Sequence, residues 1–508
     1  DIPPEKNPRG RIWLQHRQDL ITGTVVRAEI GYISDRNFLE QYYEVEWDTD
    51  KDHTTGFWLE RNEGTQSKNL TVDFQLNGFF TQTSGVRAEH FVLGQPLFNN
   101  RAIWHSHSQA GYVRMKRASE PEDVSEKEDF NFLAWETNVN DTDIRTYDGM
   151  KFGTRNELDF PVQVGPVKVV PYLLGDLSYW QEDLQGNDLL RGYGQTGIRA
   201  SLPVWRVDPS VQSVLWNVNG LAHKVSFDMD AFYSASSQDM SDLPLYDHLD
   251  DDSQEAFRRR FGKTTFGLST NPIGENFVDV KYDERYFAMR SGMQGNVTAA
   301  SSEIADDLSA IKFGVRQRWQ TKRGMPGKQR IVDWITFDTQ AILFPNASRD
   351  NNGADFGMFD YDFRWHIGDR FSLVSDGYFD FFSQGLRTAS FGTNFSRPEV
   401  GNLYLGYRMI EGPLSSNILS AAVTYRMSEK WGFKGGSQID FGETGNIGES
   451  LNLIYIGESF LWQFGAIYDV SRDNLSFRFG FEPRFGSRAR LFRPGGKAIP
   501  PASSDWLE

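Results

Sequence analysis

The clearest signal in the sequence is an alternation of apolar and polar residues with a period of two. Near the C-terminal end, apolar side chains occupy every second position of 475–481, with Ser476, Arg478 and Gly480 between them. Residues 460–468 repeat the pattern, and the turn-like residues 469–474 separate the two runs. Because successive side chains of a strand point to opposite faces, the two runs predict an antiparallel hairpin. The apolar positions of its last strand are Leu475, Phe477, Phe479 and Phe481.

The same alternation continues along nearly the whole chain, for example in 311–316 and 403–409. It fits two kinds of sheet. In a soluble sheet the apolar face covers a closed core, whereas in an outer-membrane barrel it meets lipid and the polar face meets a wet lumen. Three observations favour the barrel: the pattern has no domain-like breaks, its polar positions are often Arg, Lys, Gln or Gly, and Phe, Tyr and Trp supply much of the apolar face.

Chain length sets the expected number of strands. A spanning strand with its connector takes roughly 20 residues, so 508 residues predict about 25 strands. We therefore predict an all-β fold, a large antiparallel transmembrane outer-membrane β-barrel of roughly 20–26 strands. The barrel is expected to span residues 1–485, and 486–508 to form a polar C-terminal tail. Residues 428–430 predict a tight turn, whereas 119–129 and 243–260 predict long loops, the first of them acidic.

Composition supports a folded membrane protein that does not bind nucleic acid. Aromatic residues make up 14% of the chain, which excludes disorder. The longest apolar runs are four residues, as in 132–135, so no transmembrane helix is expected. A net charge of -16 argues against double-stranded nucleic acid as a partner, because phosphate binding needs a basic surface. With no Cys, the chain has neither disulfides nor thiolate metal sites.

Few residues suggest site chemistry. His105 and His107 share one face of a predicted strand but lack a third ligand at a recognisable spacing, so we predict no metal site. The acidic loop 119–129 is either a solvated loop or a binding site for divalent cations. The basic residues Lys312, Arg316 and Arg318 are predicted to face the lumen, either lining an anion path or pairing with carboxylates. No catalytic signature is present, and we expect neither an enzyme nor a cofactor.

Several segments resemble the lipopolysaccharide-assembly family LptD, also called OstA. The first comprises 9–16 and 33–39, where the family has a strand with Trp and His before an SDK-x-aromatic motif. The second comprises His223, Tyr233 and 237–247, matching a family element that reads DQSDLP-x-FD. Segments 315–322, 332–335 and 341–345 and the hairpin 451–481 also match. The family motif residues are Asp239, Ser241, Asp242, Leu243, Pro244 and Asp247.

The resemblance implies a transporter that inserts lipopolysaccharide into the outer leaflet of the cell outer membrane. In this family a 26-stranded barrel holds an LptE-like lipoprotein as a plug and opens laterally between its first and last strands. Lipopolysaccharide arrives over an LptA-like periplasmic bridge and passes through an N-terminal jelly-roll, and the barrel assembly machinery folds the protein. The last strand, with Leu475, Phe477, Phe479 and Phe481, is then expected to be one edge of the gate.

The sequence also departs from the family. The first matching segment lies several strands into the family's barrel, so the jelly-roll and the first strands are expected to be missing from this chain. Many members carry adjacent cysteines where this chain reads Gly457-Glu458-Ser459-Phe460, so the disulfide of those members is not expected here. Two other functions remain open from the residues alone: a diffusion porin or gated channel, and a soluble β-rich binding protein.

Overall fold

The computed structural model describes residues 8–483 apart from segments within the connectors. The segments outside the description are 21–22, 44–45, 48–51, 81, 117, 120, 122–146, 184–185, 248–279, 300, 326, 369, 398–399, 414, 443–444 and 471–472. The predicted polar tail, residues 486–508, lies outside the described residues. So do most of the acidic loop 119–129 and residues 248–260 of the second long loop.

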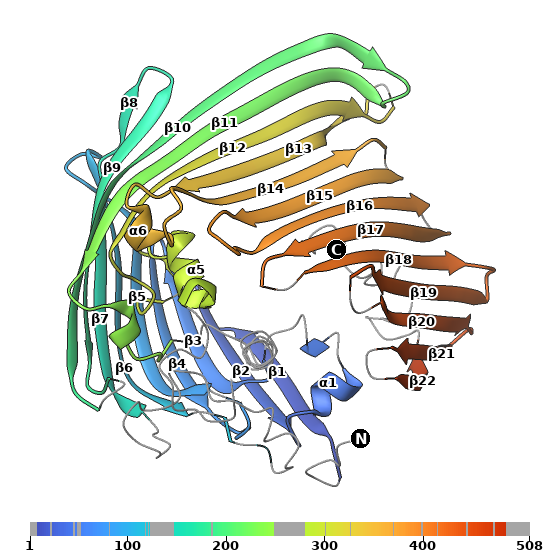
Figure 1. Ribbon diagram of the computed structural model, residues 1–508, viewed down its shortest axis with the longest axis horizontal. Helices are drawn as coiled ribbons and strands as arrows, with labels where there is room; N and C mark the ends of the chain where they lie inside the picture. Colours follow the sequence, from blue (N-terminus) through green and yellow to red (C-terminus); the bar gives the residue numbers. More distant parts are fainter. Residues whose placement is uncertain are drawn as a thin grey trace. The chain divides into compact units, whose positions relative to one another are not determined.

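The described residues fold almost entirely as strands (Figure 1). The first strands are β1 (Arg11–Asp19), β2 (Thr24–Ile33), β3 (Thr55–Glu63), β4 (Gln66–Phe74), β5 (Gln82–Leu97), β6 (Ala102–Lys116), β7 (Tyr147–Asp159), β8 (Val162–Val164) and β9 (Val167–Trp180). Three long strands follow: β10 (Leu189–Ser213), β11 (Val218–Ser236) and β12 (Leu308–Arg323). The remaining strands are β13 (Arg330–Leu343), β14 (Phe356–His366), β15 (Phe371–Asp380), β16 (Arg387–Arg397), β17 (Gly401–Glu411), β18 (Ser416–Arg426), β19 (Trp431–Asp440), β20 (Gly445–Ile456), β21 (Phe460–Asp469) and β22 (Asn474–Pro483).

Helices are short and lie in connectors: α1 (Phe38–Tyr42), η2 (Met240–Asp242), η3 (Val280–Tyr282), α5 (Glu284–Arg290) and α6 (Ala347–Asp350). No helix of the described residues is long and apolar enough to cross a membrane.

The predicted fold class is confirmed. The described residues form 22 strands in one sheet, within the expected 20–26. Consecutive strands pair antiparallel, as in β1 with β2, β5 with β6 and β13 with β14. The predicted C-terminal hairpin is β21 with β22, where Tyr468 pairs with Leu475 and Trp462 with Phe481. A tight turn at 428–430 joins β18 to β19 and is closed by a hydrogen bond from Met427 N to Trp431 O.

The chain divides into two compact units, each with its own connector pattern. Unit 1 comprises Asp1–Val164, Lys168–Arg199 and Asp230–Ala310; unit 2 comprises Gly165–Val167, Ala200–Met229 and Ile311–Glu508. In unit 1 the connectors 20–23, 64–65 and 98–101 at one end of the strands are short, whereas 34–54, 117–146 and 237–307 at the other end are long. Such a split between short turns and long loops is typical of outer-membrane barrels. In unit 2 most connectors between successive strands are short at both ends, and the longest, 344–355, contains α6.

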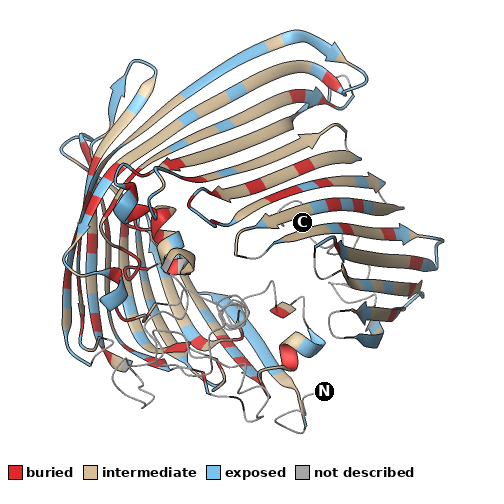
Figure 2. Ribbon diagram, viewed as in Figure 1, coloured by how far each residue is buried: buried red, intermediate tan, exposed pale blue. Residues whose placement is uncertain are grey.

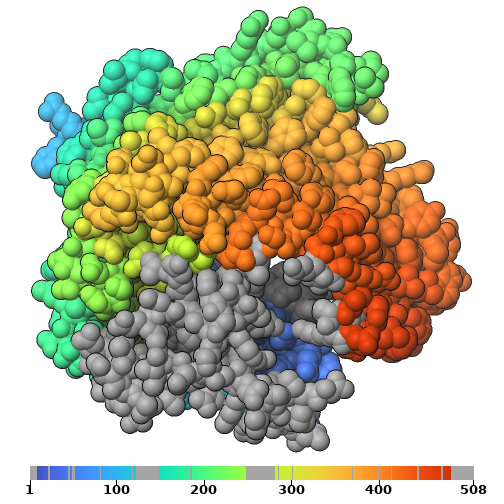
Figure 3. Space-filling model, viewed as in Figure 1, coloured from blue at the N-terminus to red at the C-terminus, as the bar shows by residue number. Residues whose placement is uncertain are grey.

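Each strand has an apolar and a polar face, as the period of two requires. Buried and exposed residues alternate along many strands (Figure 2). In unit 1, Phe152 and Leu177 are exposed, whereas Lys151 and Asp176 on the opposite faces of the same strands are buried. In unit 2 the exposed set includes Phe391, Leu451 and Phe464. The space-filling view shows the strands of this unit, orange to red, forming one continuous surface (Figure 3). Exposed apolar side chains on successive strands are what a sheet presents to lipid.

Candidate functional site

The segment that carries the family motif begins where β11 ends. Ser236 N donates to Asp307 Oδ1 at 2.8 Å, and Met240 N donates to Asp306 Oδ2 at 2.9 Å. Asp239 precedes the short helix η2 in an extended conformation, with φ -70° and ψ 146°. Both ends of the 237–307 connector are therefore tied together beside the ends of β11 and β12.

Apolar residues of the motif anchor this connector to the polar face of unit 1. Leu243 and Tyr246 are fully buried in a cluster with Val113 and Met115 of β6 and Trp180 of β9. Pro244 is buried beside Leu243. The burial of a large apolar side chain stabilises by about 1.5–3 kcal/mol, so Leu243 and Tyr246 fix the path of the connector. The other motif residues, Asp239, Ser241 and Asp242, are exposed.

Asp247, the last motif residue, lies in a buried charged group that we call the Lys151 cluster: Lys151, Asp247, Ser301, Glu303 and Trp180. Lys151 Nζ is 2.6 Å from Asp247 Oδ1 and 2.8 Å from Glu303 Oε1. Ser301 Oγ donates to Asp247 Oδ2 at 2.7 Å. The side chains of Lys151 and Glu303 are 2% and 0% exposed. Two separate parts of the connector thus meet on one strand, β7.

Glu303 is satisfied by donors from both the connector and the sheet. Its Oε2 accepts hydrogen bonds from the backbone N of Tyr246 and of Asp247, both at 2.8 Å. Its Oε1 accepts from Trp180 Nε1 at 3.1 Å. A buried carboxylate is tolerated only when it is paired and hydrogen-bonded, and Glu303 meets both conditions.

The pKa values of the two carboxylates in the cluster are shifted in opposite directions. Burial alone would raise the pKa of Asp247, but the charge of Lys151 and the hydrogen bonds from Lys151 and Ser301 outweigh it and lower the pKa. For Glu303, burial and the negative charge of Asp247 raise the pKa, although Lys151 acts in the other direction. Lys151 therefore holds Asp247 ionised, and Glu303 is the carboxylate that protonates more easily.

Two further arginine groups hold the same connector. Arg155 of β7 is 2.9 Å from Asp176 Oδ2, and its Nη1 donates to the carbonyl of Asn296 at 3.3 Å. Arg199 of β10 contacts Glu157 at 2.5 Å and donates to the carbonyl of Gly295 at 2.9 Å. Polar side chains of β7 and β10 thus bind the backbone of the connector, which covers this part of the polar face of unit 1.

The three basic residues predicted on the lumen side do share one face of β12. Arg316 is 2.9 Å from Asp228, and Arg318 forms two hydrogen bonds with Asp338, at 2.6 and 2.7 Å. The sequence left two roles open for these residues, lining an anion path or pairing with carboxylates. Both arginines pair with carboxylates in the described structure. Lys312, Arg316 and Arg318 lie in unit 2 and belong to a different group from the Lys151 cluster.

The predicted gate-edge residues all lie on the apolar face of β22. Leu475, Phe477, Phe479 and Phe481 are 55%, 80%, 60% and 51% exposed. On the neighbouring strand Trp462 and Phe464 contact this row, with ring centroids 4.8 Å (Trp462–Phe481) and 5.3 Å (Phe464–Phe479) apart.

The two halves of the first motif meet at the start of β1. Arg9 Nη2 is 2.6 Å from Asp35 Oδ1, and Gly10 N donates to Ser34 Oγ at 3.0 Å. Burial alone would raise the pKa of Asp35, but hydrogen bonds from Arg9 and Ser34 and the charge of Arg9 outweigh it and lower the pKa. This motif therefore fixes the first turn of the connector 34–54.

Sequence reasoning missed Lys151, Trp180 and Glu303. The only signal was Asp247 itself, a carboxylate directly after an apolar pair, because such a residue needs a buried partner. His105 and His107 do point to the same face; His107 Nε2 is 3.1 Å from Glu89, and His105 Nε2 is 3.6 Å from Asp159. Within the described residues, no group of three His, Asp or Glu side chains is placed to hold a metal ion.

Comparison with known proteins gives only distant structural likeness. No family model and no curated protein matches the sequence. Among solved structures, the ferric-catecholate import receptor Fiu of E. coli K12 aligns at 8% identity over 84% of this chain and 72% of Fiu, with a TM-score of 0.31. The siderophore receptor PirA of Acinetobacter baumannii aligns at 6% identity over 93% of this chain and 72% of PirA, at 0.32. A mutant of the Rh. blastica porin aligns at 8% identity over 66% of this chain and 91% of the porin, at 0.23.

Likenesses at these scores establish neither a common family nor a common function, and the assignment rests on the strands themselves. The chain is an all-β protein of the outer-membrane β-barrel class, with antiparallel strands, exposed apolar faces and a polar face that carries charge. Its candidate site is a connector fixed against that polar face by the Lys151 cluster and its neighbours.

Proposed function

We propose that the chain is the membrane-spanning part of a transporter that inserts lipopolysaccharide into the outer leaflet of the outer membrane. The observation that carries this proposal is the placement of the 237–247 motif, on which the resemblance to the LptD family depends most. Leu243 and Tyr246 are buried, and Asp247 pairs with Lys151. These three residues thus serve one structural task, the fixing of a long connector against the polar face.

The exposed row on β22 supports the proposed route. An amphiphile with several acyl chains does not cross a polar lumen whole, because its apolar surface favours hydrocarbon over water. A lipid leaving through the barrel wall therefore needs an apolar strand edge, and Leu475, Phe477, Phe479 and Phe481 provide one. The proposal includes an LptE-like plug, an LptA-like bridge and the barrel assembly machinery as partners, and no covalent chemistry.

Depletion of the protein tests the transport step. With expression shut off, lipopolysaccharide is expected to accumulate in the inner membrane or periplasm and to decline at the cell surface. Re-expression should restore surface lipopolysaccharide. Normal surface levels after full depletion would contradict the proposal.

Photo-crosslinking tests the route. A photoreactive amino acid at Phe477 of β22 should form adducts with lipopolysaccharide in growing cells. The matched control is Leu177 on β9, which is 54% exposed on the apolar face of unit 1 and is not a gate residue. Adducts at both positions with equal yield would show ordinary contact with membrane lipid rather than a route along β22.

A diffusion porin or gated channel is the second candidate. The paired charges on the polar face of unit 2, Arg316 with Asp228 and Arg318 with Asp338, are the kind of lining that aqueous pores carry. The purified protein in planar bilayers separates the two: a large, steady conductance in the absence of any partner favours the channel.

A further inference from the structure

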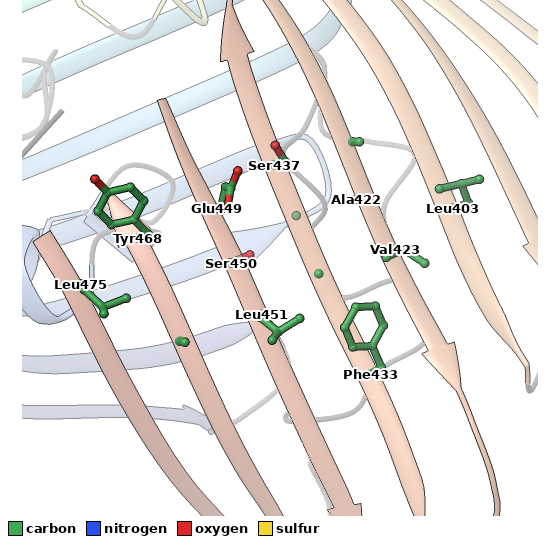
Figure 4. Close-up of a pocket in the computed structure, with 14 residues that line it drawn as sticks. Leu403, Ala422, Val423, Phe433, Ser437, Glu449, Ser450, Leu451, Tyr468 and Leu475 are labelled. Atoms are coloured by element: carbon green, nitrogen blue, oxygen red, sulfur yellow. The ribbon is translucent and has the colours of Figure 1, made fainter. Parts of the chain in front are cut away.

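A shallow trough crosses the apolar face of unit 2 and ends at β22 (Figure 4). Its volume is about 490 Å³. It arises because three of the four neighbouring strands β18–β21 place small residues on this face: Ala421 on β18, Gly435 and Ser437 on β19, and Ala466 on β21. Larger side chains border it, among them Phe433, Leu403 and Leu475 (Figure 4).

The trough lies on the side that meets hydrocarbon. Its border residues Leu403, Leu451 and Leu475 belong to the exposed apolar set of unit 2. Pairing places Phe477 of β22 next to Ala466, so the trough continues directly into the row proposed as the gate edge. A lipid that leaves along β22 would meet this trough first.

One end of the trough is polar. Glu449 is exposed on the same face, opposite Ser437 on one side and Tyr468 on the other. Within the described residues its hydrogen bond is a long one, 3.4 Å from Asn446 Nδ2. A carboxylate on the lipid-facing side is unfavourable unless donors reach it. Glu449 therefore favours a bound molecule that brings hydrogen-bond donors, and its negative charge disfavours a phosphate beside it.

We propose that the trough binds one acyl chain of a glycolipid, with sugar hydroxyls of the same molecule donating to Glu449. This inference rests on the proposed function and adds a binding site to it. The apolar lining fits a hydrocarbon chain, and the single carboxylate at one end fits uncharged hydroxyl donors. Lipid A also carries phosphates, but its free sugar hydroxyls reach Glu449 with the phosphates elsewhere on the disaccharide. In phosphatidylglycerol the phosphate adjoins the acyl chains and would lie beside Glu449, where it is repelled.

The test uses the purified full chain in detergent, with lipid retention measured by native mass spectrometry. The probes are purified lipid A, phosphatidylethanolamine and phosphatidylglycerol. The double variant Ala421→Leu/Ala466→Leu fills the trough, and Glu449→Gln removes the charge while keeping the shape. The control, Ala28→Leu, enlarges a residue of β2 in unit 1, outside the trough. Folding of each variant is verified by heat-modifiable migration in gels.

Wild type and the control should retain lipid A in preference to phosphatidylglycerol. The filled variant should retain it at least about tenfold more weakly, and Glu449→Gln about three- to tenfold more weakly. If the filled variant fails to fold, Glu449→Gln alone decides. Retention of lipid A unchanged in Glu449→Gln and in the filled variant would overturn the proposal. Equal retention of phosphatidylethanolamine and lipid A would overturn the assignment to a glycolipid.

The outcome is separable from that of the transport proposal. Retention is measured on purified protein, whereas depletion and crosslinking are measured in cells. Loss of the trough site with intact crosslinks at Phe477 would leave the transporter standing and remove only this site. If the trough retains lipid A but surface lipopolysaccharide stays normal after depletion, the binding site stands and the transport proposal falls.

Discussion

The polar faces of the two units handle charge in different ways. In unit 1, Lys151, Glu303 and Arg191 are buried, and a connector of the same unit supplies the partners of Lys151. In unit 2, the side chains of Arg318 and Asp338 are 34% and 35% exposed and pair between neighbouring strands. Buried ion pairs cost several kcal/mol to break, whereas exposed pairs contribute little. The comparison teaches that the charge on β7 of unit 1 anchors a connector, whereas the Arg318–Asp338 pair between β12 and β13 of unit 2 stays partly solvated.

The largest effect is expected from Lys151→Met. It leaves Asp247 and Glu303 buried without their cation, which should lower the free energy of unfolding by about 3–5 kcal/mol. Urea unfolding in lipid vesicles measures the loss in free energy of unfolding. Hydrogen exchange of residues 240–247 and 301–307 shows whether the loss is located in the connector. The double variant Lys151→Met/Asp247→Asn should lose less than the sum of its parts, because the charges are removed together. Lys312→Met on β12 is the matched control, and an equal loss in the control would break the comparison.

The apolar faces of the two units should respond alike to a charge, in contrast to their polar faces. Phe479→Arg on β22 and Leu177→Arg on β9 each place a cation toward lipid, with an expected loss of about 2–4 kcal/mol. Ser476→Arg, on the opposite face of β22, should cost little. The free energy of unfolding in vesicles is again the measurement. A small loss at Leu177 beside a large one at Phe479 would show that unit 1 does not present this face to lipid.

Period-two patterns predicted the strands and the faces of the sheet because both follow from local geometry. The hairpin of 460–468 with 475–481 and the placement of Arg318 on the polar face came from this rule alone. The Lys151 cluster did not, since Lys151 and Glu303 lie 152 residues apart in sequence and meet only when the connector folds over β7. Asp247 was recognised through the family motif, but nothing in the sequence names its partner. Distant pairing of charges depends on the path of a connector, which no short pattern encodes.

A moderate, pH-dependent effect is expected at the connector 34–54 of unit 1. Asp35 has a lowered pKa, so its stabilising pairing with Arg9 is fully present above the ordinary pKa of about 3.9 and is lost as pH falls through the lowered value. At pH 7, Asp35→Asn should cost about 1 kcal/mol, with allowance for solvent screening. The difference between wild type and variant, followed by thermal unfolding, should vanish in acid. A difference that persists below pH 2 would mean that Asp35 acts by shape rather than charge.

The smallest effect is expected from Arg318→Met in unit 2. The pair with Asp338 has good geometry, with bonds of 2.6 and 2.7 Å, but both side chains keep about a third of their surface exposed. Exposed pairs contribute about 0.2–1 kcal/mol and are weakened by salt, so the loss should stay below about 1 kcal/mol and shrink further at 1 M salt. Lys151→Met should keep its full loss at the same salt concentration, because a buried pair is poorly screened. If both losses respond to salt alike, the Lys151 cluster is open to solvent, and the polar face of unit 1 is a wall of the same kind as that of unit 2.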